Sequence, residues 1–227
     1  MIDVKLFGGV AEILLYGVIG DFMESGITAK DFVTELKAKT KRANSVLVRI
    51  NTPGGSINHG LAMFSALESL GKPVTTQVDG VAASMGSVIL LAGSKRLIAQ
   101  DGFVMIHNPQ IMAEGDASSL RSTLRQLEKL EAQAVELYAR KTKLSKEELA
   151  QFMADETWLS ASESLEHGFV TQIMKSPAVA ACAKIPAKMR RVPDRAAHLF
   201  QPQRKKADRL RWQLQRHAAR LGKLERG

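Results

Sequence analysis

The chain has 227 residues, of which 45% are hydrophobic and 24% are charged, and this composition is typical of a globular protein rather than a disordered one. Its single cysteine excludes an intrachain disulfide. Because the sequence shows neither a basic leader nor an apolar run long enough to span a bilayer, we expect a cytoplasmic protein with no membrane segment. The net charge of +9 is uneven: residues 1–175 hold 18 basic and 20 acidic residues, whereas residues 176–227 hold 14 and 3.

Strands and helices are predicted to alternate along the first hundred residues. Apolar and β-branched runs predict strands at 11–20, 46–50, 74–78, 96–98 and 103–107. Apolar residues at helical spacing predict helices at 28–40, from Ile57 to just before Lys72, and after Ser84. This alternation indicates an α/β fold with a largely parallel, buried sheet.

A long amphipathic helix is predicted after Asp116, whose side chain is a good N-cap. Its apolar residues recur every three or four positions, at Leu120, Leu124, Leu127, Leu130, Ala134 and Leu137. The pattern is longer than most globular helices. Such a helix either packs along its own domain or projects from it to meet a partner.

The remaining elements are shorter, and the pattern then changes. We expect a helix capped by Ser145, a loop with a short helix at 158–168, and a strand at 169–173. Beyond Lys175, prolines interrupt the sequence. Residues 1–175 are therefore predicted to form one domain, and residues 176–227 a basic, partly disordered tail with one helix at 207–224.

Two residues at the ends of predicted strands are candidates for nucleophilic catalysis. Ser84 lies among small residues between a strand and a helix, where a turn exposes the hydroxyl and offers the next backbone N–H to an oxyanion. His107 ends a predicted buried strand, where a general base is expected in an α/β sheet. Each residue alone also fits a structural role, as a helix-start serine and a core histidine.

Two further segments have the right chemistry to assist. The loop Asn51 to Gly55 contains consecutive glycines, which allow backbone N–H groups to approach a developing negative charge, although such loops are also common turns. Asp155 and Glu156 offer a carboxylate that can orient a histidine, although adjacent acids in loops are often only solvated. No metal-ligand spacing or nucleotide-binding fingerprint occurs, so we expect no cofactor on this chain.

Taken together, these motifs resemble the Clp protease proteolytic subunit, ClpP, and especially its shorter forms encoded by phages and prophages. The resemblance covers residues from about 10 to 173, and its motifs are NTPGGS at 51–56, GVAASMGS at 80–87, MIHNP at 105–109, ETWLSA at 156–161 and EHGFV at 166–170. The order serine, histidine, acid also differs from that of α/β-hydrolases, in which the acid precedes the histidine.

The resemblance implies a ClpP/crotonase-like fold of repeated β-β-α units and the activity of a serine endopeptidase. It implies that Ser84 is the nucleophile and His107 the general base. Glu156 stands where the family usually has an aspartate, and Asp155 is the alternative acid one residue away.

The resemblance also implies how a substrate is held. The backbone N–H groups of Gly55 and Met85 would form the oxyanion hole. Gly54, Ile111 and Met112 would bind the substrate, which would lie as an added strand beside residues 111–115.

The partners implied by the resemblance are copies of the chain itself, in stacked rings around a chamber, with protein or peptide substrates. ATP would enter only through a partner unfoldase of the AAA+ class. Two departures favour an alternative, in which the protein is a phage head maturation protease acting on a capsid or scaffold protein. The chain begins almost at its first core strand, and Arg49 replaces an aromatic residue that helps housekeeping members bind the unfoldase.

Three alternatives of other kinds stay open. A crotonase-like acyl-CoA enzyme or an inactive structural ring would share the fold, and the Ser84 and His107 pair favours the protease over both. A signal peptide peptidase would need a serine–lysine dyad and a membrane anchor. The basic tail is compatible with weak nucleic-acid binding, with docking on an acidic capsid or scaffold partner, or with a solubilising extension.

Overall fold

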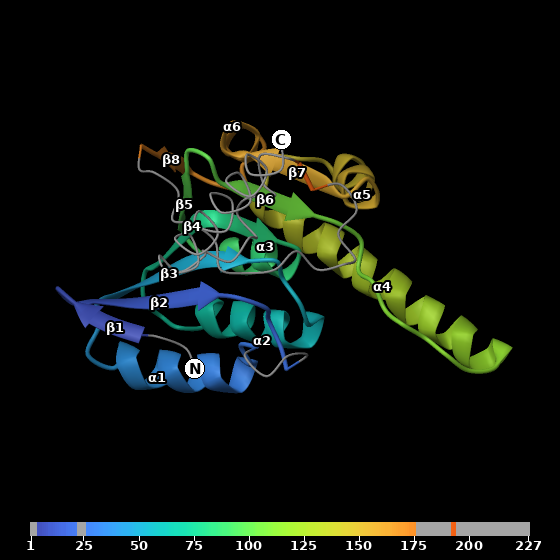
Figure 1. The fold of residues 1–227 in the computed structure, drawn as a ribbon, viewed down its shortest axis with the longest axis horizontal. Coiled ribbons are helices and arrows are strands. Elements are labelled where there is room, and N and C mark those ends of the chain that lie inside the picture. The colour runs from blue at the N-terminus through green and yellow to red at the C-terminus, as the bar shows by residue number, and fades with distance from the viewer. Residues whose placement is uncertain (1–3, 22–25, 176–191, 194–227) are drawn as a thin grey trace, which may run out of the picture.

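The computed structural model describes residues 4–21, 26–175 and 192–193, and these residues form one α/β sandwich with a long projecting helix (Figure 1). The strands are β1 (Val4–Phe7), β2 (Val10–Tyr16), β3 (Ser45–Thr52), β4 (Val74–Ala83), β5 (Lys95–Ala99), β6 (Phe103–Ile106), β7 (Thr157–Ser160) and β8 (Gln172–Met174). The helices are α1 (Ala29–Thr40), α2 (Ile57–Glu68), α3 (Met85–Leu90), α4 (Ala117–Lys141), α5 (Lys146–Ala154) and α6 (Ala161–Glu166).

The sheet of the described residues is mainly parallel, with the order β1-β2-β3-β4-β5-β8. Strand β4 is the branch point, because residues 75–78 pair with β5 and residues 81–83 pair with β6. Strand β7 then adds to β6 in the antiparallel direction, and β1 adds to β2 in the same way. The predicted fold class is confirmed.

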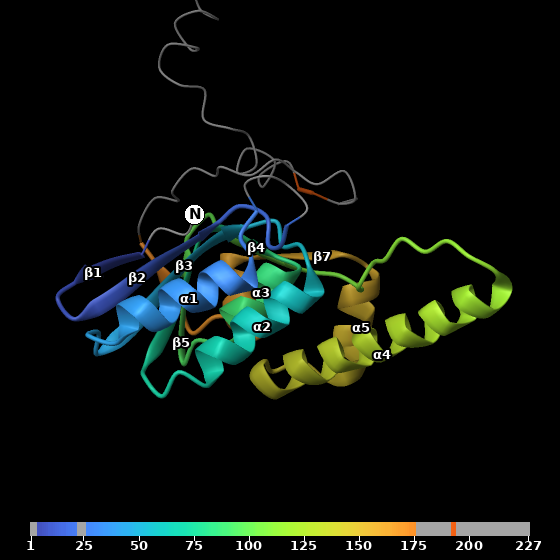
Figure 2. The same ribbon diagram turned by 90° about the horizontal axis from the view of Figure 1, so that it is seen from below.

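Helices α1, α2 and α3 cover one face of the sheet (Figure 2). Strand β2 alternates between buried and half-buried residues, as expected when only one face meets the core. Phe32 of α1 and Met63 of α2 lie in that core, and both are fully buried. The helices begin at predicted caps: Thr28 Oγ1 accepts from the Asp31 N–H, and Ser56 Oγ accepts from the His59 N–H.

Helix α4 projects beyond the body of the domain (Figures 1 and 2). Asp116 caps its first turn by accepting from the Ser119 N–H at 2.8 Å. Only near its C-terminal end does it bury residues, Leu137 and Tyr138. Leu124 is 54% exposed. Of the two arrangements left open by the sequence, the structure therefore shows the projecting one.

Three predictions need correction or lie outside the described residues. Trp158 was predicted in a loop but belongs to β7, a strand formed by tertiary pairing with β6. The last strand begins at Gln172 instead of Phe169, because Phe169 is buried in the core ahead of the sheet ladder. The predicted helix at 207–224 lies outside the described residues. In the portion that is described, no helix has the length and apolarity needed to cross a membrane.

Candidate active site

Ser84 occupies a sharp turn between β4 and α3. Its backbone has φ 53° and ψ −121°, a region that residues other than glycine rarely adopt and that costs on the order of 1–3 kcal/mol. The turn is held by its own hydrogen bonds: the Ser84 N–H donates to the Met105 carbonyl at 2.9 Å, and the Ser87 hydroxyl donates to the Ser84 carbonyl at 2.6 Å. Ser84 is therefore the N-cap residue of α3, but its side chain makes no capping hydrogen bond to that helix.

His107 follows β6, and the sheet register brings it to Ser84. Ala83 pairs with Met105 in the parallel ladder of β4 and β6, so both strands end at the same edge. His107 Nε2 lies 2.9 Å from Ser84 Oγ. Burial lowers the pKa of His107, and the negative charge of Glu156 partly opposes this. This lowering favours the neutral imidazole, which is the form that can accept a proton.

Glu156 reaches the same edge from the other side of β6. Strand β7 begins directly after it, and Ile106 pairs with Thr157, so the antiparallel register places Glu156 next to His107. Glu156 is 8% exposed and has a positive φ of 50°. The strand register and the effect of the Glu156 charge on the pKa of His107 together place this buried carboxylate near the imidazole.

Asp155, the alternative acid, lies in a different environment. It is half-buried and forms the C-cap of α5, where its Oδ2 accepts from Gln151 Nε2 at 2.6 Å. The charge that opposes the lowering of the His107 pKa is that of Glu156. The environment of His107 therefore favours Glu156 over Asp155.

Gln110 is a neighbour of His107 that sequence reasoning missed. Its side-chain amide lies 3.4 Å from His107 Nδ1. The Gln110 atom at this distance is Nε2, which can only donate. If His107 Nε2 accepts the Ser84 proton, Nδ1 carries a proton and needs an acceptor, and the Glu156 carboxylate has the chemistry for that role. The only sequence signal was the position of Gln110, three residues after His107.

The glycine loop packs directly against the serine turn. A Cβ at Gly54 would lie 2.7 Å from Ser84 Cβ and 3.0 Å from the Met85 nitrogen, so only glycine fits there. Gly55, next in the chain, has φ 148° and is exposed. The structure thus places Gly54 against the predicted nucleophile, whereas Gly55 lies beside Ile19.

Asn51 gives the start of this loop a second function, which sequence reasoning also missed. Its side-chain Oδ1 accepts from the Val81 N–H at 3.2 Å, where the β3–β4 register shifts between Ile50 and Thr52. The side chain thereby replaces a missing ladder bond and ties the glycine loop to the strand that ends in Ser84.

The predicted substrate residues Ile111 and Met112 lie in the segment between β6 and α4. They are 41% and 88% exposed. The structure leaves these apolar side chains accessible a few residues beyond His107. Among the described residues, no group of three or more His, Cys, Asp or Glu side chains is placed to hold a metal ion.

A serine hydroxyl hydrogen-bonded to an imidazole, with a buried carboxylate beside that imidazole, is the arrangement that defines the serine hydrolases as a class. The sequence comparisons narrow this class. A family model described as Clp protease matches residues 6–177. The chain therefore belongs to the Clp protease family, and it is a serine-type peptidase.

Curated relatives agree with this assignment. The chain is 34% identical over 141 residues to the "ATP-dependent Clp protease proteolytic subunit 1" of Chlamydia muridarum. The aligned region covers 60% of this chain and 73% of that protein. It is 30% identical over 164 residues to the protein of the same name from Protochlamydia amoebophila, covering 70% of this chain and 79% of that protein. The resemblance indicated by the motifs is confirmed, and the chain is a peptidase instead of a crotonase-like acyl-CoA enzyme.

Proposed function

We propose that the chain is an endopeptidase subunit that cleaves peptide bonds with a triad of Ser84, His107 and Glu156. The observation that carries this proposal is the 2.9 Å contact between Ser84 Oγ and His107 Nε2 at the aligned ends of β4 and β6. The strained turn at Ser84 supports it, because unusual backbone conformations of this kind concentrate at functional sites.

The reaction proceeds in two halves. Ser84 Oγ attacks the carbonyl carbon of the substrate while His107 Nε2 takes the hydroxyl proton, and the protonated imidazole then gives that proton to the leaving amine. Water next attacks the acyl-enzyme, again with His107 as the base, and releases the second product. Glu156 stabilises the imidazolium that forms in each half, which is consistent with the effect of its charge on the pKa of His107.

The tetrahedral intermediates need donors for their negative oxygen. We assign these to the backbone N–H groups of Gly55 and Met85. The proposal is supported by the close fit of the glycine loop on the serine turn, where Gly54 lies against Ser84 and the Met85 nitrogen. Donors that are already in place before the reaction stabilise the negative oxygen most effectively.

The substrate would bind in an extended form between Gly54 and the exposed segment that contains Ile111 and Met112. Main-chain pairing of this kind requires no particular side chains, so it suits an enzyme with many protein or peptide substrates.

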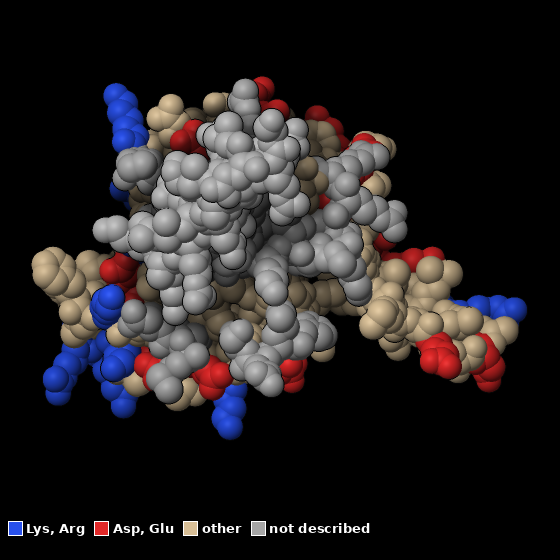
Figure 3. Space-filling view, in the orientation of Figure 1, with Lys and Arg blue, Asp and Glu red and all other residues tan. Residues whose placement is uncertain are grey.

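We propose that the working enzyme is an oligomer of stacked rings in which α4 contacts another subunit. The support is the exposure of Leu120 and Leu124 on a helix that leaves its own domain. Figure 3 shows acidic and basic side chains together on the projecting end of α4, so charge can flank the apolar contact. We place the assembly in the cytoplasm.

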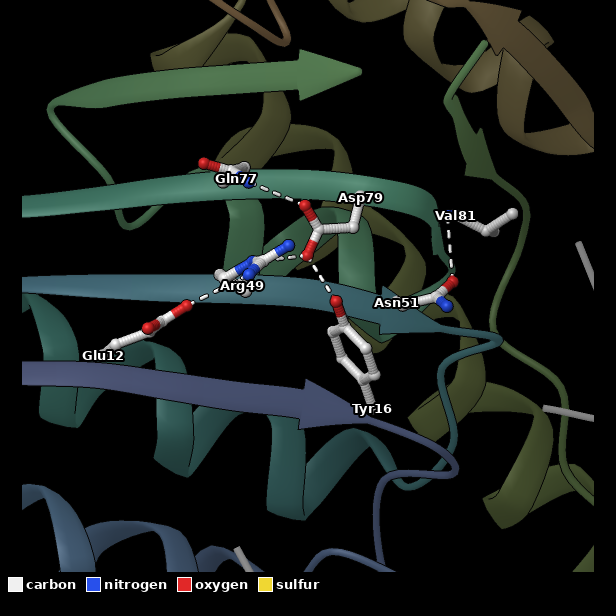
Figure 4. A network of polar contacts seen from close by, with 7 residues as sticks. All are labelled: Glu12, Tyr16, Arg49, Asn51, Gln77, Asp79 and Val81. Carbon is white, nitrogen blue, oxygen red and sulfur yellow. Dashed lines mark hydrogen bonds and ion pairs between the residues drawn. The ribbon is translucent and has the colours of Figure 1, made fainter. Parts of the chain in front are cut away.

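The partner that delivers substrate is open to two proposals. The relatives are named as ATP-dependent Clp proteases, which favours an AAA+ unfoldase as the site of ATP use. The alternative, a phage head maturation protease acting on a capsid or scaffold protein, is supported by the charge at Arg49. This side chain donates to the buried Asp79 at 2.7 Å and to Glu12 at 3.1 Å, so a partly buried ionic network occupies this part of the sheet face (Figure 4).

Labelling with a fluorophosphonate probe tests the proposed nucleophile. We expect the purified protein to gain the mass of one probe molecule per subunit, and the Ser84→Ala variant to gain none. Labelling of the variant at an equal rate would place the reactive group elsewhere. Failure of a folded, assembled protein to label would contradict the proposed triad.

A further inference from the structure

A second apolar cluster lies on the sheet face opposite to the main core. Its buried members are Val81, Ala83 and Met105, which are 1% exposed or less. Phe103, Trp158 and Val192 pack against them. The five members that lie in strands are called the back patch here: Val81, Ala83, Phe103, Met105 and Trp158. Val192 comes from the C-terminal segment, far along the chain from the others.

The strand register explains why the back patch is continuous. Val81 pairs with Phe103 and Ala83 with Met105 across β4 and β6, and Met105 pairs with Trp158 across β6 and β7. The rings of Phe103 and Trp158 meet edge to face, with centroids 6.4 Å apart. Three strands therefore present one apolar surface, which would be costly to leave in water.

These three strands also carry the proposed catalytic residues. Ala83 directly precedes Ser84, and the Met105 carbonyl accepts the Ser84 N–H at 2.9 Å. The Trp158 indole N–H points to Glu156 Oε1 at 3.5 Å. A residue that packs on the back patch therefore contacts residues that are adjacent to, or hydrogen-bonded with, the proposed catalytic residues Ser84 and Glu156.

We infer that Val192, which is followed by Pro193, is a built-in ligand of the back patch supplied by the same chain, and that this docking helps to hold the catalytic strand ends. The second part of this inference rests on the proposed triad. Both residues are half-buried. Pro193 has a fixed φ and no N–H that needs a partner, and the branched Val192 has few rotamers, so this dipeptide loses little entropy when it docks.

The test uses Trp158 as a reporter. The chain has two tryptophans, so Trp212→Phe leaves Trp158 alone. In this background, Val192→Asp should shift the Trp158 emission to longer wavelength and raise the acrylamide quenching constant about twofold, because a half-buried indole becomes solvated. The same change at Val179 in the C-terminal segment is the matched control and should alter neither value. Equal spectra for Val192→Asp and its parent would overturn the inference.

A pair of truncations gives an independent answer. A chain that ends at Pro193 should keep the protected Trp158, and one that ends at Arg191 should lose that protection. If both chains keep it, residues 192–193 are not the ligand, and the inference is wrong.

Co-expression distinguishes docking within one chain from docking between two copies. The single-tryptophan Val192→Asp chain is co-expressed with an excess of chains that lack both tryptophans and keep Val192. Docking within one chain predicts no recovery of protection. Recovery would assign the segment to a neighbouring copy and overturn the assignment to the same chain.

The link to the site is tested by the rate of fluorophosphonate labelling. We expect Val192→Asp to slow labelling several-fold, whereas the conservative variant Val192→Ile should label at the rate of the parent protein. An unchanged rate would overturn the link. If the parent protein does not label at all, the proposed triad fails, whereas the fluorescence still decides whether Val192 docks.

Discussion

The outer face of β4 changes character between two consecutive outward-facing residues, Asp79 and Val81. Asp79 is 3% exposed and accepts hydrogen bonds from Tyr16, Arg49 and Gln77 at 2.5 to 2.7 Å (Figure 4). This half of the face is therefore polar, and its buried carboxylate is hydrogen-bonded by neighbouring side chains. From Val81 onward the face is apolar, and Val192 packs against it. Asn51 bonds the Val81 N–H at the boundary.

The difference shows how one strand can serve two purposes. The polar half holds the middle of the sheet through charge-assisted hydrogen bonds, which need specific geometry. The apolar half carries the strand ends with the proposed catalytic residues, and it depends on packing from outside the strands. Changes to the apolar half should therefore alter catalysis, and changes to the polar half should alter stability.

The largest effect is expected for the acid beside His107. Replacement of Glu156 by Gln keeps the shape but removes the charge that stabilises the imidazolium, so peptide hydrolysis should fall by about 10²–10⁴-fold. The matched change Asp155→Asn should leave kcat/KM nearly unchanged. Steady-state cleavage of a fluorogenic peptide measures both. The opposite order of effects would assign the acid to Asp155.

In the polar half, Asp79→Asn should act mainly on stability. Asparagine offers the Arg49 and Tyr16 donors a weaker acceptor, and the lost charge-assisted bonds should cost about 1–3 kcal/mol in the free energy of unfolding. Urea denaturation measures the loss, and Asp101→Asn at an exposed turn is the control. Below the unfolding range, the rate of labelling at Ser84 should match the wild type. A rate as low as that of Glu156→Gln would show that the two halves are not independent.

The projecting helix α4 is a third region, distinct from the two halves of the β4 face, and a change in it should affect the assembly of subunits. Leu124→Glu should weaken the contact between subunits by about 1.5–3 kcal/mol per buried leucine, and sedimentation velocity should show smaller particles. Gln126→Glu adds the same charge at an exposed position and should sediment like the wild type. Unchanged sedimentation of the Leu124 variant would place the subunit contact away from this side chain.

Much of this arrangement could be predicted from the sequence, because the signals were local. Ser84 and His107 stand beside apolar strands and small residues, so their positions at strand ends followed from short patterns. The choice between Asp155 and Glu156 did not, because adjacent carboxylates differ only in burial and backbone, which the fold determines. The contact of Val192 with the back patch joins distant segments and left no periodic signal in the chain.

The tertiary origin of β7 explains another difference. The segment of Trp158 has no strand pattern of its own, and it becomes a strand because β6 offers an unpaired edge. The direction of α4 could not be predicted either, since an amphipathic stripe is compatible with packing inside a domain or between subunits.

The smallest expected effect is a shift in the pH dependence of kcat/KM, and the direction of this shift again distinguishes Glu156 from Asp155 as the acid. Hydrolysis needs neutral His107, so the rate should fall as the pH drops through the pKa of His107, which burial places below the ordinary 6.5. Because the charge of Glu156 raises this pKa, Glu156→Gln should move the midpoint of kcat/KM further down, even though the rate at every pH is lower. Asp155→Asn should leave the midpoint in place. A midpoint that rises in Glu156→Gln would mean that burial of the carboxylate, and not its charge, governs the imidazole.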